Sequence, residues 1–303
     1  MTDIKDIALP IYAEIDDFCK FLFEIFTQQQ LLGKAKIRNR KSTLSLSEIM
    51  TIVVLFHLSG YRTFKKFYIE KICKDMSSEF PKVVSYNRMT ELEKFATIPL
   101  LLYMSTQRTG KVTGISFLDS THIPVCHTKR IKQNKVFKGY AKRGKTTIGW
   151  FYGFKLHLII NDKGEIISFA ITKGNVDDRD PAVIYLLTKK LFGKIFADKG
   201  YIKKDLFEQL FGNGIELITK LRRNMKGKIM SLSDRLLLRK RAIIESVNDE
   251  LKNICQIVHS RHRSKINWLT NLLSGLVAYT FLPKKPTLKI YKEEIQELTL
   301  LRA

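Results

Sequence analysis

The feature that most constrains the fold is a β-hairpin pattern in the middle of the chain. Residues 153–160 form a strand-like run in which apolar and polar side chains alternate from Phe154 to Leu158, and the turn sequence Asn161-Asp-Lys-Gly164 follows them. Residues 165–172 then read as the partner strand. Helical patterns flank this hairpin on both sides, so the sequence predicts a mixed α/β domain with its sheet in the middle.

The elements around the hairpin follow from short apolar runs and helical periodicity. Strands are predicted over 112–118, 194–197 and 215–219, and helices over 181–191, 203–211, 233–259 and 266–281. The pattern contains neither an internal repeat nor a low-complexity tract. It predicts an α/β domain over residues 109–303 that ends in a closing helix.

Residues 1–108 have a different pattern of apolar residues, and this pattern predicts an all-helical domain. Apolar residues recur at helical spacing from Ile15 to Phe26, and Ser45-Leu-Ser-Glu48 has the pattern of a capping box before an apolar helix. The basic segment 34–41 precedes that helix. This domain is either a DNA-reading module or a helical cap with a solvated loop, and the sequence leaves both open.

The charge balance indicates the class of partner. The chain of 303 residues has 53 Lys and Arg against 29 Asp and Glu, a net charge of +24. Such an excess repels itself unless a polyanion neutralises it, and nucleic acid is the commonest one. The acidic start of the chain does not resemble a secretion signal, and the longest apolar stretch, 268–282, is too short to span a membrane. We therefore expect a cytoplasmic nucleic-acid-binding protein without a membrane segment.

Basic residues cluster where DNA contacts are expected. Residues 120–161 contain no acid. Within and beyond that stretch, the cations predicted to bind phosphates are Lys142, Arg143, Lys145, Lys155, Arg222 and Arg223. Trp150 and Phe151 lie beside the first group. They either stack on an unpaired base or are core residues that open a strand.

Two aspartates follow apolar strands. Asp119 comes after the run 115–118, and Asp198 comes after the run 195–197. A carboxylate at the end of a buried strand is costly unless it is compensated, and a divalent metal is the usual compensation. The alternative is that each aspartate caps the helix that follows it.

A third carboxylate lies on the predicted long helix. Arg241, Glu245 and Lys252 are four and seven residues apart, so all three project from one helix face. In that arrangement Glu245 could hold a metal while the two cations bind phosphates. The alternative is an ordinary surface ion pair.

Together these motifs resemble the DDE transposases of bacterial insertion sequences. Asp119 in Phe117-Leu-Asp-Ser-Thr121 matches the first aspartate of that family, and Asp198 in Phe196-Ala-Asp-Lys-Gly-Tyr201 matches the second. The helix signature Tyr-x2-Arg-x3-Glu-x6-Lys matches Arg241, Glu245 and Lys252, with Leu238 in place of the tyrosine. Gly153-Phe-Lys-Leu-His157 and Gly174-Asn-Val-Asp177 resemble the family's strand and turn motifs.

The resemblance implies an RNase H-like catalytic domain that cuts and joins DNA at the ends of an insertion sequence. It implies two Mg²⁺ ions, with Mn²⁺ as a substitute, bridged by Asp119 and completed by Asp198 and Glu245. The implied partners are double-stranded DNA with terminal inverted repeats, target DNA and a second copy of the chain, in a nucleoid-associated complex. The alternatives are a nuclease of the same fold that stops at hydrolysis and an inactive DNA-binding repressor.

Overall fold

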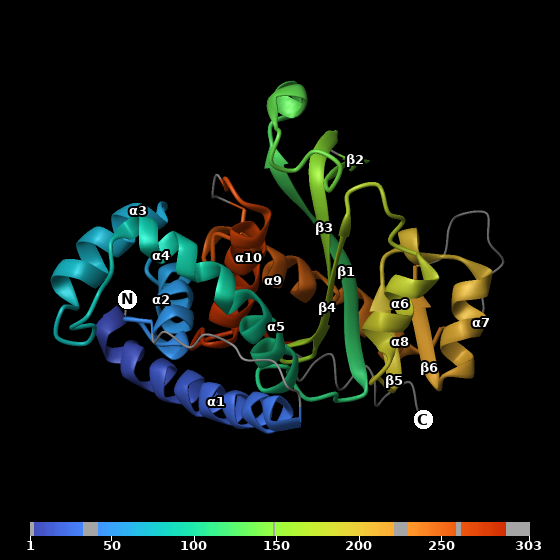
Figure 1. Cartoon of the computed structure of the whole chain (residues 1–303). Helices are drawn as coiled ribbons and strands as arrows, with labels where there is room; N and C mark the ends of the chain where they lie inside the picture. Colours follow the sequence, from blue (N-terminus) through green and yellow to red (C-terminus); the bar gives the residue numbers. More distant parts are fainter. Residues whose placement is uncertain (1–2, 33–41, 148, 221–229, 259–261, 289–303) are drawn as a thin grey trace. The chain divides into compact units, whose positions relative to one another are not determined.

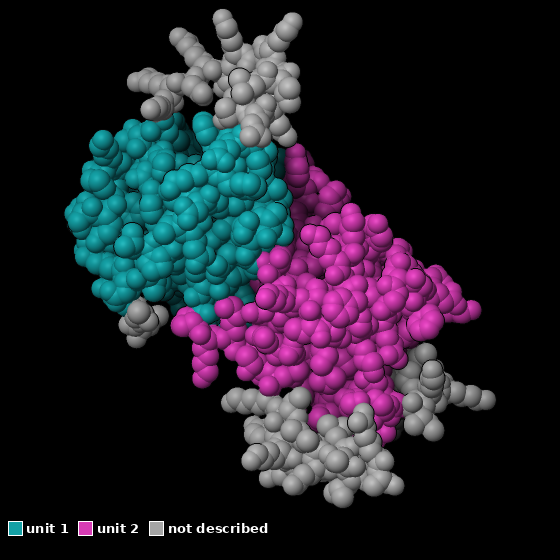
Figure 2. Space-filling view, turned by 90° about the horizontal axis from the view of Figure 1, so that it is seen from below, with its two compact units in different colours: residues 1–108, 250–282 teal, residues 109–249, 283–303 magenta. Residues whose placement is uncertain are grey.

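The computed structural model describes residues 3–32, 42–147, 149–220, 230–258 and 262–288. The chain divides into two compact units (Figure 2): residues 1–108 with 250–282, and residues 109–249 with 283–303. Within the described residues, no helix is both long enough and apolar enough to cross a membrane.

The first unit is helical. Its elements are α1 (Ile4–Leu32), α2 (Leu46–Leu58), α3 (Phe64–Lys66), the π-helix η1 (Phe67–Asp75), α4 (Tyr86–Leu92), the 3₁₀-helix η2 (Glu93–Ala96), α5 (Thr97–Thr106) and α10 (Lys265–Thr280). Helix α2 begins with the predicted capping box. The Glu48 backbone N–H donates to Ser45 Oγ at 3.1 Å, and the Ser45 backbone N–H donates to Glu48 Oε2 at 2.6 Å. That prediction is confirmed.

The closing helix α10 belongs to this helical unit, although the sequence placed it in the catalytic domain. It packs against α2 and α5, and its side chains from Leu272 to Tyr279 are buried. A helix that is apolar on nearly every side needs neighbours on several sides. The N-terminal helices supply them, so the first unit is built from two separate parts of the chain, residues 1–108 and 250–282.

The second unit contains a six-stranded mixed sheet (Figure 1). Its strands are β1 (Ile115–Cys126), β2 (Lys142–Lys145), β3 (Trp150–Asn161), β4 (Ile166–Lys173), β5 (Gly193–Ala197) and β6 (Ile215–Thr219). The order is β2-β3-β1-β5-β6, and β4 pairs with β3 beside β2. Strands β1, β3 and β4 are antiparallel neighbours, whereas β5 and β6 run parallel to β1. This mixed sheet, with a helical region before it in the chain, agrees with the predicted RNase H-like class.

Helices cover the sheet. The remaining elements are η3 (Thr128–Gln133), α6 (Pro181–Thr188), η4 (Lys199–Tyr201), α7 (Lys204–Gly212), α8 (Leu232–Arg239) and α9 (Ala242–Asn253). Leu118 and Ala197 of the sheet share one core cluster with Ile184 of α6 and Leu206 of α7. Helices α6 and α7 therefore cover the same face of the sheet, and this burial holds β1 and β5 in place.

The predicted long helix over 233–259 is divided at Lys240 and Arg241. At the break, the hydrogen bonds shorten to three-residue spacing: the Ile243 and Ile244 amides donate to the Lys240 and Arg241 carbonyls, each at 3.1 Å. Helix α8 is fixed separately, because Lys194 Nζ binds both carboxylate oxygens of Asp234, at 2.7 and 2.9 Å. The single-helix prediction is therefore wrong, and α9 starts immediately after Arg241.

Candidate active site

Asp119 lies inside a strand and not at its end. Strand β1 was predicted to stop at Leu118, but it continues to Cys126 because these later residues pair with β3, Asp119 opposite Leu158. Strand β5 pairs with β1 only from Ile115 to Leu118. Asp119 is therefore the first residue of β1 beyond the parallel pairing with β5.

Asp198 occupies the equivalent place after β5. Ala197 is paired with Leu118. Asp198 directly follows Ala197 and Asp119 directly follows Leu118, so the two aspartates take the next position of the same register. Paired residues of neighbouring strands project to the same face. That face also carries Phe117 and Phe196, whose ring centroids are 5.7 Å apart. The Asp198 side chain is exposed and makes no helix-capping hydrogen bond, so the alternative role of a cap is absent there.

Helix α9 brings Glu245 and Asn248 toward Asp119. Asn248 Nδ2 donates a hydrogen bond to Asp119 Oδ2 at 3.2 Å. Arg241, just before the helix, donates from Nη2 to Glu245 Oε1 at 2.9 Å. The Glu245 side chain is 60% exposed and that of Arg241 is 19% exposed. Sequence reasoning missed Asn248, although its position three residues after Glu245 put it on the same helix face.

The electrostatics around Asp119 show which groups gather there. Burial raises the pKa of Asp119 to about 6. The Ser120 backbone N–H and the Arg241 guanidinium lower that pKa, whereas the carboxylates of Glu245 and Asp178 raise it further. Buried Tyr201 has its pKa raised by burial and then by Asp178 and Asp119. Asp178 is therefore a member of this cluster that the sequence did not identify.

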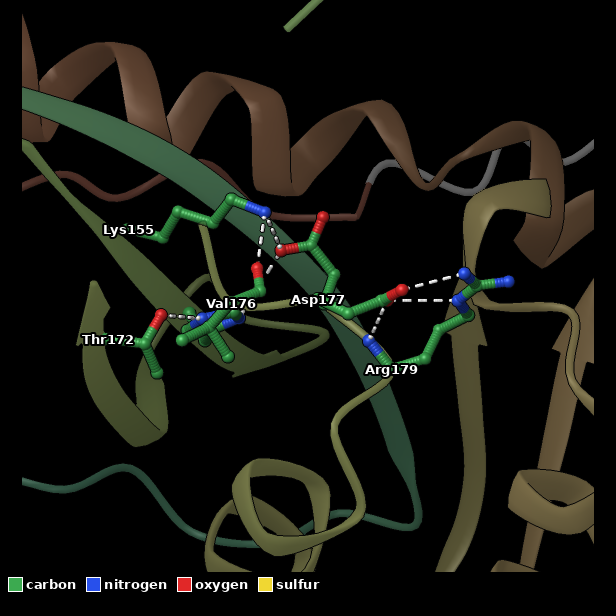
Figure 3. A network of polar contacts seen from close by, with 7 residues as sticks. Lys155, Thr172, Val176, Asp177 and Arg179 are labelled. Carbon is green, nitrogen blue, oxygen red and sulfur yellow. Dashed lines mark hydrogen bonds and ion pairs between the residues drawn. The ribbon is translucent and has the colours of Figure 1, made fainter. Parts of the chain in front are cut away.

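Asp178 belongs to a polar network on the turn after β4 (Figure 3). Lys155 Nζ donates to Asp178 Oδ1 and to the Val176 carbonyl, each at 2.9 Å. His157 Nε2 and Thr172 Oγ1 lie 2.8 Å apart, and His157 Nδ1 lies 3.9 Å from Asp178 Oδ1. Burial lowers the pKa of His157, while Asp178 opposes that shift. The network joins β3, β4 and the following turn next to Asp119.

The next residues of that turn form a second ion pair. Arg179 Nε and Nη2 donate to the two carboxylate oxygens of Asp177 at 2.9 and 2.7 Å (Figure 3). This bidentate pairing is the first cause of the low pKa of Asp177, and the Arg179 backbone N–H adds to it. Asp177 and Asp178 are thus each matched to a cation. The sequence motif 174–177 marked this turn but stopped one residue short of Asp178.

The predicted DNA-binding residues fall into three groups. Lys142, Arg143 and Lys145 lie on β2 and are exposed. Lys252 lies on α9, seven residues after Glu245, and is half-buried. Arg222, Arg223 and the basic segment 34–41 lie outside the described residues. Lys155 differs from the prediction, because its side chain is only 14% exposed and its ammonium is bound to Asp178.

The carboxylates suit a hard divalent cation by their chemistry. Asp119, Asp198 and Glu245 supply only oxygen donors. The raised pKa of Asp119, caused partly by neighbouring carboxylates, is the effect that a bound cation would reverse. Among the described residues, no three His, Cys, Asp or Glu side chains are already gathered as a metal site. The exposed Glu245 side chain is instead paired with Arg241.

The comparison with known proteins covers this region. A family model described as a transposase DDE domain matches residues 109–265. No curated protein matches the chain. The family match spans the whole mixed sheet and α9, and it includes Asp119, Asp198 and Glu245. Since it extends over more than half of the 303 residues, the chain belongs to the transposases with a DDE domain.

Proposed function

We propose that this transposase cleaves DNA and transfers the cut strand at the ends of a bacterial insertion sequence. The observation that carries the proposal is the meeting of Asp119, Asp198 and α9 where the parallel part of the sheet ends. The three carboxylates come from elements that are distant in sequence: β1, the residue after β5, and α9. Transposases act on DNA, so a site of this composition is expected to act on phosphodiester bonds.

The proposed metal ligands are Asp119, Asp198 and Glu245. These three carboxylates would hold two Mg²⁺ ions, for which Mn²⁺ could substitute, and the bound ions would supply charge stabilisation for the attacking and leaving oxygens. Asn248 donates to Asp119 Oδ2 and so fixes the orientation of that carboxylate. Arg241 lowers the pKa of Asp119 and favours its charged form.

The proposed DNA contacts are mostly exposed cations. Lys142, Arg143 and Lys145 would bind phosphates from β2, and Lys252 and Arg241 would do so from α9 and its start. Arg222 and Arg223 remain part of the proposal from the sequence alone. Lys155 and Arg241 are each paired with a carboxylate, so a phosphate contact by either one would require its ion pair to be exchanged. The proposed substrates are terminal inverted repeats and target DNA, bound by a homodimer at the nucleoid.

The test is a cleavage assay on the full chain with labelled duplexes that carry the element's ends. Asp119→Asn should abolish cleavage in Mg²⁺ and leave DNA affinity equal or higher, because a negative charge near phosphate is removed. Asp205→Asn is the matched control: Asp205 is 80% exposed on α7 and pairs only weakly with Lys203, at 3.9 Å. Its cleavage rate should equal that of the unmodified chain.

The outcomes separate the three functions. Cleavage followed by joining to a target plasmid supports the transposase reaction. Cleavage without joining would indicate a nuclease of the same fold, and binding without cleavage would indicate a repressor. Full cleavage by Asp119→Asn would overturn the assignment of the site.

A further inference from the structure

The hairpin of β2 and the start of β3 presents an exposed indole. The Trp150 side chain is 59% exposed, whereas the neighbouring Phe151 is 6% exposed. In the hairpin register, Lys145 is paired with Trp150 and Gly144 with Phe151. Phe151 is thus the core residue that opens the strand. Trp150 has no such role, and the hydrophobic effect opposes leaving a large apolar ring in water.

The hairpin holds Trp150 in a fixed place. Phe151 packs over Gly144, where a Cβ would lie 2.5 Å from the Phe151 ring. On the other side of the strand, Tyr152 Oη donates to the Phe137 carbonyl at 3.1 Å. The Thr146 backbone N–H donates to the Gly149 carbonyl at 2.8 Å and closes the turn. An aromatic ring on such a support loses little conformational entropy when a ligand binds to it.

Two cations share the face of Trp150. Arg143 and Lys145 are two residues apart on β2, so both project to the side on which Trp150 lies. The Arg143 guanidinium carbon is 5.9 Å and Lys145 Nζ is 5.8 Å from the centre of the indole ring. In the described part of the chain neither cation is recorded in an ion pair, and residues 120–161 contain no acid. The site therefore offers a ring face and two positive charges without an anion.

We infer that Trp150 is a stacking platform for an unpaired nucleobase of DNA, with Arg143 and Lys145 on the adjoining phosphates. A nucleotide supplies both an aromatic face and an anion, and stacking on an aromatic side chain tolerates any base. Inside a duplex each base face is covered by its neighbours, so only an unpaired or terminal base can stack there. The inference rests on the proposed function for its ligand, since cleavage and joining create strand ends.

The experiment uses the intrinsic fluorescence of the full chain. The chain has two tryptophans, Trp150 and Trp268, and Trp268 is buried on α10 in the helical unit. The Trp150→Phe variant reports Trp268 alone, so its difference from the unmodified chain reports Trp150. The ligands are a short oligothymidylate and a covalently closed circular duplex, which has neither strand ends nor loops. EDTA is present, so no cleavage occurs.

We expect the oligothymidylate to quench Trp150 and to leave Trp268 unchanged. Trp150→Ala should weaken oligothymidylate binding about 5- to 150-fold, the equivalent of one stacked base. Trp150→Phe should retain most of the affinity, since it keeps an aromatic face. The matched control is Phe211→Ala, a 77% exposed aromatic on α7, which should bind normally. Arg143→Gln should reduce the slope of log affinity against log salt by about one.

Two results would overturn the inference. One is unchanged Trp150 fluorescence at saturating oligothymidylate. The other is an equal loss of affinity for the oligothymidylate and for the closed circular duplex in Trp150→Ala, which would indicate general phosphate contact. Failure of the proposed function is distinguishable, because it appears as absent cleavage in Mg²⁺ and leaves the fluorescence result in EDTA intact.

Discussion

A buried histidine makes the stability of the helical unit depend on pH. His57 lies on α2, its side chain is buried, and its Nδ1 donates to the Cys255 carbonyl. Burial lowers the pKa of His57 to about 4 from an ordinary value of 6.5. Between these two pH values the unfolded chain binds a proton that the folded unit does not. The free energy of unfolding therefore falls as pH falls. At about 1.4 kcal/mol per pH unit, the fall between pH 6.5 and pH 4 is about 3 kcal/mol.

Two further groups act in the same unit. Burial and the charge of His57 also lower the pKa of His262 to about 4, so it adds a slope of the same sign. Glu93 has the opposite effect: burial raises its pKa to about 8, against a hydrogen bond from Asn267 that lowers it. Its stabilisation is complete below the unfolded pKa of 4.5 and is lost as pH rises to 8. Since two histidines outweigh one glutamate below pH 6.5, stability should be greatest near pH 6.5.

The assay is urea unfolding of the Trp150→Phe chain between pH 4 and 8, followed by Trp268 fluorescence. His57→Asn keeps a side-chain N–H for the Cys255 carbonyl and removes the titrating group. We expect the acid-dependent fall in the free energy of unfolding to be about 3 kcal/mol smaller in His57→Asn than in the parent chain. This expectation holds whatever the substitution does to the free energy of unfolding at pH 7. His127→Asn changes an exposed histidine in the other unit and is the control. An acid slope in His57→Asn equal to that of the parent chain would refute the reasoning.

Two other predictions concern the catalytic unit. Asp178→Asn removes the negative charge that neutralises the little-exposed Lys155 ammonium and leaves only neutral acceptors. Urea unfolding should therefore show a loss of about 1–3 kcal/mol. Adding Lys155→Met should recover part of that loss, and purely additive losses would contradict a direct pair. Gly153→Ala would place a Cβ 2.1 Å from the Ile123 carbonyl oxygen and so force β1 and β3 apart. Both the unfolding free energy and cleavage should fall, and unchanged cleavage would show that this pairing does not position Asp119.

The sheet was predictable where its signals are local. The turn at 161–164 and the alternation before it placed the β3–β4 hairpin, and the apolar run 215–219 coincides with β6. The second half of β1 was not predictable in this way. Residues 119–126 are mostly polar and include Pro124, so they lack the pattern of a strand. They are extended because β3, which lies further along the chain, pairs with them. Strand pairing of this kind is a tertiary effect that local propensity does not contain.

The site shows the same limit. Asp119, Asp198 and Glu245 were named from strand ends and helix spacing, but Asn248 and Asp178 were not, because only the fold brings them to Asp119. The break between α8 and α9 has no glycine or proline to mark it. It reflects the tertiary contact of Asp234 with Lys194, which fixes α8 independently of α9.

The described cations of the catalytic unit are of two kinds: those paired with a carboxylate and those without a described ion pair. This difference decides which of them contribute most to DNA affinity. Near Asp119 the cations have internal partners: Arg241 binds Glu245, and Lys155 binds Asp178. A phosphate that binds either cation must displace its carboxylate partner. The binding free energy from that contact is therefore reduced by the free energy of the ion pair that is lost. Arg143 and Lys145 on β2 lie near the Trp150 ring and form no ion pair with the described residues, so a phosphate would not have to displace a described carboxylate there and would release counterions. The salt dependence of binding should therefore come mainly from the hairpin, while changes at Arg241 should act mainly on the carboxylates around Asp119.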